Sequence, residues 1–96
     1  MIGASRSSLG LTAGNNLVKG PLTGPADGRI YSITVTTAGA AGAVYDSPTT
    51  AAIGPSNLIF TIPAVVGVYN FADGFPFGSG LVVSPGAGQV VSVSFR

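Results

Sequence analysis

From residue 29 onward, apolar and polar residues alternate along most of the chain, which is the pattern of half-buried β-strands. Residues 29–36 show it most clearly, because Tyr31, Ile33 and Val35 fall on one face while serine and threonine fall on the other. The same alternation recurs in shorter segments separated by glycine and proline. We predict six strands, at residues 29–36, 43–46, 57–63, 65–71, 80–84 and 89–96.

The connections between these segments are rich in small residues and in turn formers. Residues 37–42 and 85–88 consist of threonine, alanine, glycine and proline, which suits tight turns. We therefore expect two hairpins, one pairing residues 29–36 with 43–46 and one pairing 80–84 with 89–96. Residues 73–77 are expected to form a further turn that carries two aromatic side chains.

Short strands spaced by 8 to 12 residues, with almost no good helix formers, predict an all-β domain. We expect a small antiparallel β-sandwich or jelly roll over residues 29–96. Its predicted core consists of the alternating apolar residues of three strands: Tyr31, Ile33, Val35, Leu58, Phe60, Ile62, Val91, Val93 and Phe95.

Residues 1–28 differ from the rest, because turn formers interrupt only short apolar pieces. We interpret this segment as an extended N-terminal arm that reaches a neighbouring molecule; a disordered tail is the alternative. On the first interpretation its apolar residues are contact candidates, and removal of residues 1–20 leaves a folded domain. These candidates are Leu9, Leu11, Leu17 and Val18.

Phe75 and Phe77 flank Pro76 in the expected glycine-rich turn, and two roles are open to them. Such a pair is either tucked under the loop as part of the core or presented to a neighbouring subunit. The core is the more common place for a large aromatic side chain. The pair is nevertheless added to the candidate protein contacts.

Composition removes most of the groups that perform chemistry. The chain has four Lys or Arg residues and three Asp residues, with no His, Cys, Glu or Trp. Asp27, Asp46 and Asp73 each lie beside a turn residue or at a strand end, where aspartate commonly caps a bend. Residues 78–80 and 86–88 resemble phosphate-binding loops, but neither is followed by a P-loop lysine. We therefore expect no enzyme activity, no cofactor and no metal site.

The few charges also limit the expected partners. The four cations, Arg6, Lys19, Arg29 and Arg96, are scattered, whereas nucleic-acid binding needs clustered ones. The apolar runs are far shorter than a membrane span, and no targeting segment is evident, so we expect a protein made in the cytoplasm. The polar faces of the strands carry Ser and Thr in place of Lys and Glu, so uncharged strand edges are expected to be covered by a partner.

Four sequence segments resemble the small β-sandwich proteins that decorate or cement the capsids of tailed bacteriophages. They are residues 29–35 (RIYSITV), residues 44–46 (VYD), the IPA…G.Y pattern of residues 62–69, and GFPFGSGLVVSPGAGQVVSVSFR from Gly74 to Arg96. The resemblance covers roughly residues 28–96.

The resemblance implies a virion structural protein that binds the outer surface of the capsid and stabilises it. The implied partners are the major capsid protein and the chain itself, as a dimer or trimer, and the implied location is the capsid surface. No catalytic residues are carried over. The alternative is a phage head-fibre or tail-fibre module that binds a receptor; a cellular β-sandwich is a third interpretation.

Overall fold

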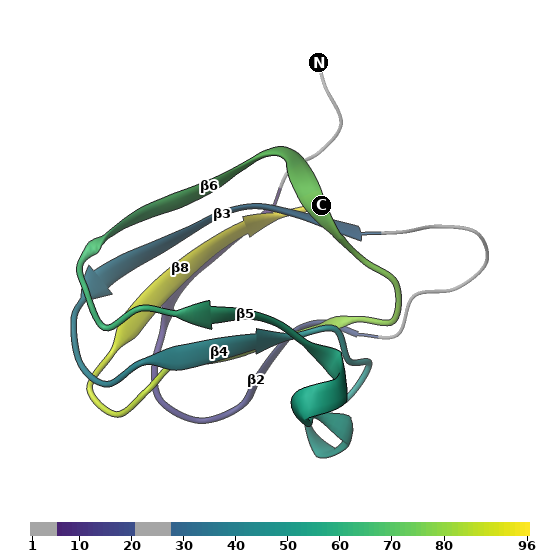
Figure 1. The fold of residues 1–96 in the computed structure, drawn as a ribbon, viewed down its shortest axis with the longest axis horizontal. Helices are drawn as coiled ribbons and strands as arrows, with labels where there is room; N and C mark the ends of the chain where they lie inside the picture. The colour runs from purple at the N-terminus through teal and green to yellow at the C-terminus, as the bar shows by residue number, and fades with distance from the viewer. Residues whose placement is uncertain (1–5, 21–27) are drawn as a thin grey trace.

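The computed structural model describes residues 6–20 and 28–96, which form eight β-strands in two four-stranded antiparallel sheets (Figure 1). The all-β sandwich prediction is therefore confirmed. In order across the first sheet lie β1 (Arg6–Leu11), β8 (Val90–Phe95), β3 (Gly28–Thr37) and β6 (Gly67–Phe77). The second sheet consists of β2 (Asn16–Lys19), β7 (Leu81–Ser84), β4 (Gly42–Tyr45) and β5 (Leu58–Ile62).

The chain alternates between the two sheets at almost every connection. Only β4 and β5 are consecutive strands of one sheet, and two 3₁₀ turns, η1 (Thr50–Ala52) and η2 (Pro55–Asn57), join them. Each other connection crosses from one sheet to the other. An eight-stranded double sheet wound in this way is a jelly roll.

Both hairpins expected from the sequence are wrong. Strand β3 pairs with β6 and β8, whereas β4 pairs with β5 and β7, so residues 38–41 cross between sheets. Residues 85–89 cross in the same way from β7 to β8. The alternation of side chains shows which face of a strand is apolar. It does not show whether the next strand in the sequence pairs with it in the same sheet or packs against that face from the opposite sheet.

Residues 6–20 are part of the sandwich and do not form a separate arm. Strand β1 pairs with β8 and β2 pairs with β7, so each sheet gains one edge strand from this segment. Leu11 and Val18 pack against the core. Short strands suffice here because the existing sheets supply their hydrogen-bond partners. The expected boundary between residues 28 and 29 therefore does not divide the domain; residues 1–5 and 21–27 of the predicted arm lie outside the described residues.

The core contains six of the nine residues predicted for it: Ile33, Val35, Ile62, Val91, Val93 and Phe95. Tyr31 is only half-buried, and Ile30 takes its place in the core. A bulge in β3 causes this exchange, because Ile30 and Ser32 face the consecutive residues Phe95 and Ser94 of β8. Leu58 is exposed because a bulge in β5 turns it to the outer face beside Tyr45, and Phe60 is half-buried because β5 is an edge strand.

The expected turn at residues 73–77 is instead the second half of β6. Phe77 pairs with Gly28 of β3 and is 1% exposed, within the core. Its ring lies so close to Gly28 that a Cβ atom there would overlap it. A glycine at the start of β3 therefore makes room for the aromatic side chain.

Candidate interaction surface

The antiparallel arrangement places four loops at one end of the sandwich. In the first sheet, β1 and β3 end there and β6 and β8 begin there. In the second sheet, β5 and β7 end there and β2 and β4 begin there. The four loops are residues 12–15, 38–41, 63–66 and 85–89, at the left in Figure 1. The opposite end holds the carboxyl terminus and the connections β4–β5 and β6–β7.

The charged residues lie away from these four loops, whose sequences are TAGN, AGAA, PAVV and PGAGQ. Since none of these residues is charged, we call this end the uncharged end and the other the charged end. The charged residues in the described part of the chain lie at strand boundaries of the charged end or in the second half of β6: Arg6, Lys19, Arg29, Asp46, Asp73 and Arg96.

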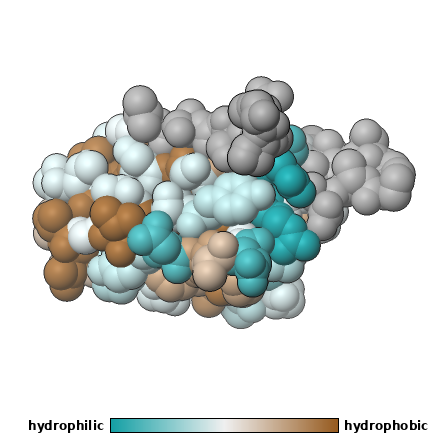
Figure 2. Space-filling view, turned by 90° about the horizontal axis from the view of Figure 1, so that it is seen from above, coloured by the Kyte–Doolittle hydropathy of each residue, from teal (hydrophilic) through white to brown (hydrophobic). Residues whose placement is uncertain are grey.

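The uncharged end exposes apolar side chains. Val65 and Val66, in the β5–β6 loop, are 60% and 59% exposed, and Val68 at the start of β6 is 57% exposed. The alanines of all four loops are exposed as well. Figure 2 shows hydrophobic side chains gathered at its left-hand end, where the β5–β6 loop lies in Figure 1. Contiguous apolar surface of this kind commonly marks an interaction site.

Hydrogen bonds of one buried side chain and of the backbone join three of these loops. Gln89 is fully buried, and its Nε2 donates to the Pro63 carbonyl oxygen at 3.0 Å. Its Oε1 accepts from the Gly86 amide at 3.1 Å, and the Ala40 amide donates to the Ala87 carbonyl at 2.9 Å. The loops at residues 38–41, 63–66 and 85–89 are therefore held together before any partner binds.

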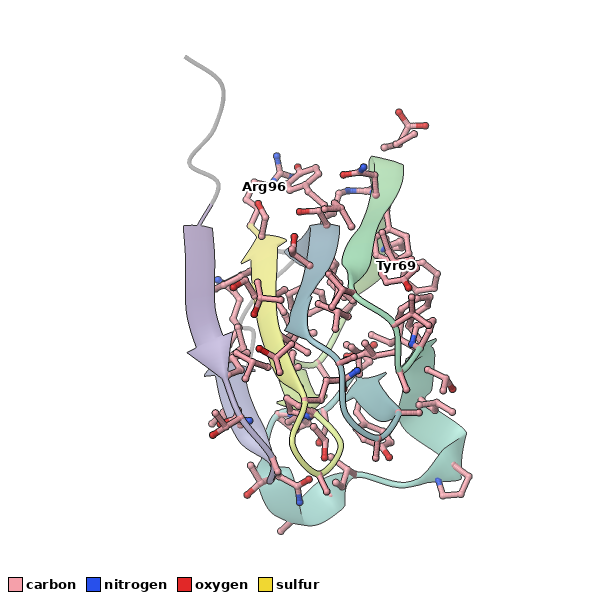
Figure 3. All side chains as sticks on the ribbon, turned by 90° about the vertical axis from the view of Figure 1, so that its left-hand side faces the viewer. Tyr69 and Arg96 are labelled. Atoms are coloured by element: carbon pink, nitrogen blue, oxygen red, sulfur yellow. The ribbon has the colours of Figure 1, made fainter. Side chains whose placement is uncertain are left out.

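Close backbone packing adds to this order. A Cβ atom at Gly39 or Gly86 would collide with backbone atoms of the facing loop. Tyr69 of β6, labelled in Figure 3, donates a weak hydrogen bond of 3.5 Å to the Val65 carbonyl. Figure 3 looks from the uncharged end, and Arg96 lies beyond the far end of β8.

At the charged end, the Asp46 carboxylate organises the β6–β7 turn. It accepts hydrogen bonds from the successive amides of Gly78, Ser79 and Gly80, at 2.9, 2.8 and 3.3 Å. The glycine-rich segment that resembles a phosphate-binding loop thus surrounds an anion, and that anion belongs to this chain. Asp46 therefore caps a turn, but the turn is that of residues 78–80 and not the bend beside Asp46 that the sequence suggested.

The four edge strands, β1, β2, β5 and β6, each carry extra residues that interrupt the pairing register. The largest bulge lies in β6, where residues 71–74 are displaced from β3. Arg29 braces it by donating from Nη1 to the Asp73 and Gly74 carbonyl oxygens. Bulges hinder the addition of a foreign strand, so these edges are protected without charged side chains. The final strand, β8, is flanked on both sides and is not an edge.

The outer faces of the two sheets differ in polarity. On the first sheet, the register places Ser32 beside Asn70 and Ser94, a row of short uncharged polar residues. On the second sheet, a row of large apolar or aromatic residues crosses all four strands: Leu17, Val82, Tyr45 and Leu58. Val82 is fully buried, but it does not belong to the core cluster, because its side chain lies on the outer face of β7.

The contact candidates predicted from the sequence do not form one surface. The side chain of Leu9 lies outside the described residues, Leu11 and Val18 pack on the core, and Phe77 is inside it. Leu17 and Phe75 are exposed, but they belong to opposite edges of the sandwich. Phe75 ends a row of aromatic contacts with Phe71 and Phe60 along the β5–β6 side, with centroid distances of 5.8 and 5.5 Å.

Sequence reasoning missed the uncharged end, although the signal was present in the positions of the charges. Long uncharged stretches lie at residues 7–18, 30–45, 47–72 and 74–95, and each of the four loops falls inside one of them. Without the jelly-roll topology, nothing indicates that these stretches meet at the same end.

In the described part of the chain, no three acidic, histidine or cysteine side chains are placed to hold a metal ion. Among the same residues, no helix has the length and apolar character needed to cross a membrane. No family model, curated protein or solved structure matches this chain.

Proposed function

We propose that this protein is a non-enzymatic virion component that binds the outer surface of a phage capsid and stabilises the shell. The observation that carries the proposal is the uncharged, apolar end, where the buried Gln89 joins the loops at residues 63–66 and 85–89. The sequence resemblance over residues 28–96 supports a phage capsid as the assembly to which the protein binds. On this proposal the protein is made in the host cytoplasm and then attaches to the capsid surface.

Repetition makes weak contacts sufficient for this role. A small domain has limited surface, but a capsid offers many copies of one binding site, and each bound copy can also contact its neighbours. The proposed partners are therefore the major capsid protein and further copies of this chain, as a dimer or trimer. The bulged edges favour contacts through loops and sheet faces over the addition of strands.

Co-sedimentation tests this proposal directly. The purified chain is mixed with empty shells assembled from the major capsid protein encoded in the same genome. We expect saturable binding in a fixed ratio to capsid subunits, together with greater resistance of the shells to heat. Failure of the chain to sediment with the shells would remove the proposal.

Phe75 supports a second candidate, a receptor-binding module of a phage head fibre or tail fibre. Phe75 is 40% exposed and its ring is edge-packed on Phe71; Asp73, two positions earlier in the β6 bulge, is also exposed. An exposed aromatic ring offers an apolar face on which a ligand ring can pack. Binding of the isolated chain to a glycan array, lost in Phe75→Ala, combined with no binding to shells, would favour this candidate over capsid decoration.

A further inference from the structure

We infer that the uncharged end is the surface that attaches to the shell, and that its partner there is an apolar, uncharged patch of the capsid. This inference rests on the proposed function and adds an orientation to it. The charged end then points away from the shell into water.

The distribution of charge is the first argument. Burial of a charged group at an interface is costly unless a partner charge meets it, so a surface to be buried is best built without charges. The four loops of the uncharged end contain none, whereas each charged residue in the described ranges lies in the other half of its strand or beyond. A capsid patch rich in charges would lose water there and gain no opposite charge in return.

The exposed valines are the second argument. Val65 and Val66 are the most exposed of the large hydrophobic residues described, and Val68 follows them. A buried valine side chain contributes to binding in proportion to the apolar area removed from water. The loops at residues 38–41 and 85–89 expose alanine and glycine, and the loop at residues 12–15 adds the uncharged Thr12 and Asn15. Val65 and Val66 are therefore the largest exposed apolar side chains of these loops, and they suit a shallow apolar pocket.

The order of the loops is the third argument. A surface that is already rigid loses little conformational entropy when it binds. Here the Gln89 side chain joins residues 63–66 to residues 85–89, and the Ala40 amide joins residues 38–41 to the same loop. The valines are thus carried on a segment that Gln89 holds at Pro63 and that Tyr69 holds more weakly at Val65.

Substitutions at the two ends test the inference in the co-sedimentation assay. The test variant is Val65→Asp with Val66→Asp, which places two charges on the uncharged end. The matched control is Thr50→Asp with Ala51→Asp, two exposed positions of η1 at the charged end. We expect at least about tenfold weaker shell binding for the test variant, because two charges would be buried unpaired, and little change for the control.

Salt gives an independent measurement on the unmodified chain. Raising the salt concentration from about 0.1 M to about 1 M shortens the screening length from about 10 Å to about 3 Å, which weakens binding that depends on charge. Binding through the uncharged end is expected to stay unchanged or to strengthen. A steep loss of binding with salt would overturn the inference.

Other outcomes separate this inference from the proposed function. If the unmodified chain does not bind shells, the proposed function itself fails. If it binds and the Val65→Asp, Val66→Asp variant binds equally well, only the attachment surface is wrong. If light scattering shows that this variant turns a dimer into a monomer while shell binding persists, the end contacts a second copy and the inference is overturned. A neutral variant, Val65→Ser with Val66→Ser, and thermal unfolding of each protein guard against loss of folding.

Discussion

The side-chain amide of Gln89 donates a hydrogen bond to the carbonyl oxygen of Pro63 at 3.0 Å, across 26 positions of sequence. The same side chain accepts from the Gly86 amide, so one buried residue joins the β7–β8 loop to the β5–β6 loop. Buried polar groups that lose their partners are costly, which makes Gln89 the residue on which the order of the uncharged end depends.

Replacement of this residue is expected to destabilise the protein. In Gln89→Leu the half-buried Pro63 carbonyl and Gly86 amide lose their partner, and an unpaired group costs up to about 1–3 kcal/mol when it is fully buried. We expect the free energy of unfolding, measured by urea denaturation, to fall by about 2 kcal/mol or more. Ser94→Ala, a half-buried position on the outer face of the first sheet, serves as a control with little effect. Equal stability of the two variants would contradict the assigned role of Gln89.

The Asp46 carboxylate is expected to stabilise the β6–β7 turn at the charged end. Asp46→Ala removes three amide hydrogen bonds and should lower the free energy of unfolding by about 1–2 kcal/mol, a modest value because Asp46 is only half-buried. Asp46→Asn retains one oxygen acceptor and should lose less. Faster hydrogen exchange at the Ser79 amide in Asp46→Ala would confirm the contact, and unchanged exchange would argue against it.

The bulge in β3 predicts that substitution of Ile30 destabilises the protein more than substitution of Tyr31. The alternation of residues alone predicts the opposite. Ile30 is fully buried, so Ile30→Ala should cost about 2–5 kcal/mol of unfolding free energy. Tyr31 is the extra residue of the bulge and is half-buried, so Tyr31→Ala should cost clearly less. Chemical denaturation of both variants decides the matter, and a larger loss for Tyr31→Ala would show that the pairing register of β3 with β8 is wrong.

These two residues also show how far the sequence can be interpreted. Strict alternation places Tyr31 in the core together with Ile33 and Val35. This prediction is correct for Ile33 and Val35, because both lie after the bulge. A bulge leaves no mark in a pattern of apolar and polar residues, since it depends on how three strands share one register. The fold class is accessible because strand length, turn spacing and the lack of helix formers are local properties.

The pairing of the strands and the interaction surface cannot be predicted from such local properties of the sequence. The composition of residues 37–42 predicts a hairpin turn, yet Gly39 lies against the backbone of residues 87–89 in a crossing between sheets. The sequence leaves Phe77 open between core and surface, and only its contact with Gly28 decides for the core. The uncharged end likewise exists because the topology brings four distant loops together.

Removal of residues 1–20 is expected, from the structure, to prevent folding. Strands β1 and β2 would be lost, β8 and β7 would become edges, and the core would lose the packing of Leu11 and Val18. Circular dichroism and size-exclusion chromatography of the truncated chain provide the measurement. The double variant Leu11→Ala, Val18→Ala should show a smaller loss of stability in the same direction. A truncated chain that unfolds cooperatively as a monomer would restore the interpretation of an independent arm.

An electron cryomicroscopy reconstruction of shells saturated with this protein tests the proposed attachment most directly. We predict density for a small double sheet on the outer surface, with the loops at residues 38–41 and 63–66 against the shell and the carboxyl terminus directed outward. Attachment through the end that carries Arg29, Asp46 and Arg96, or shells without added density, would contradict it.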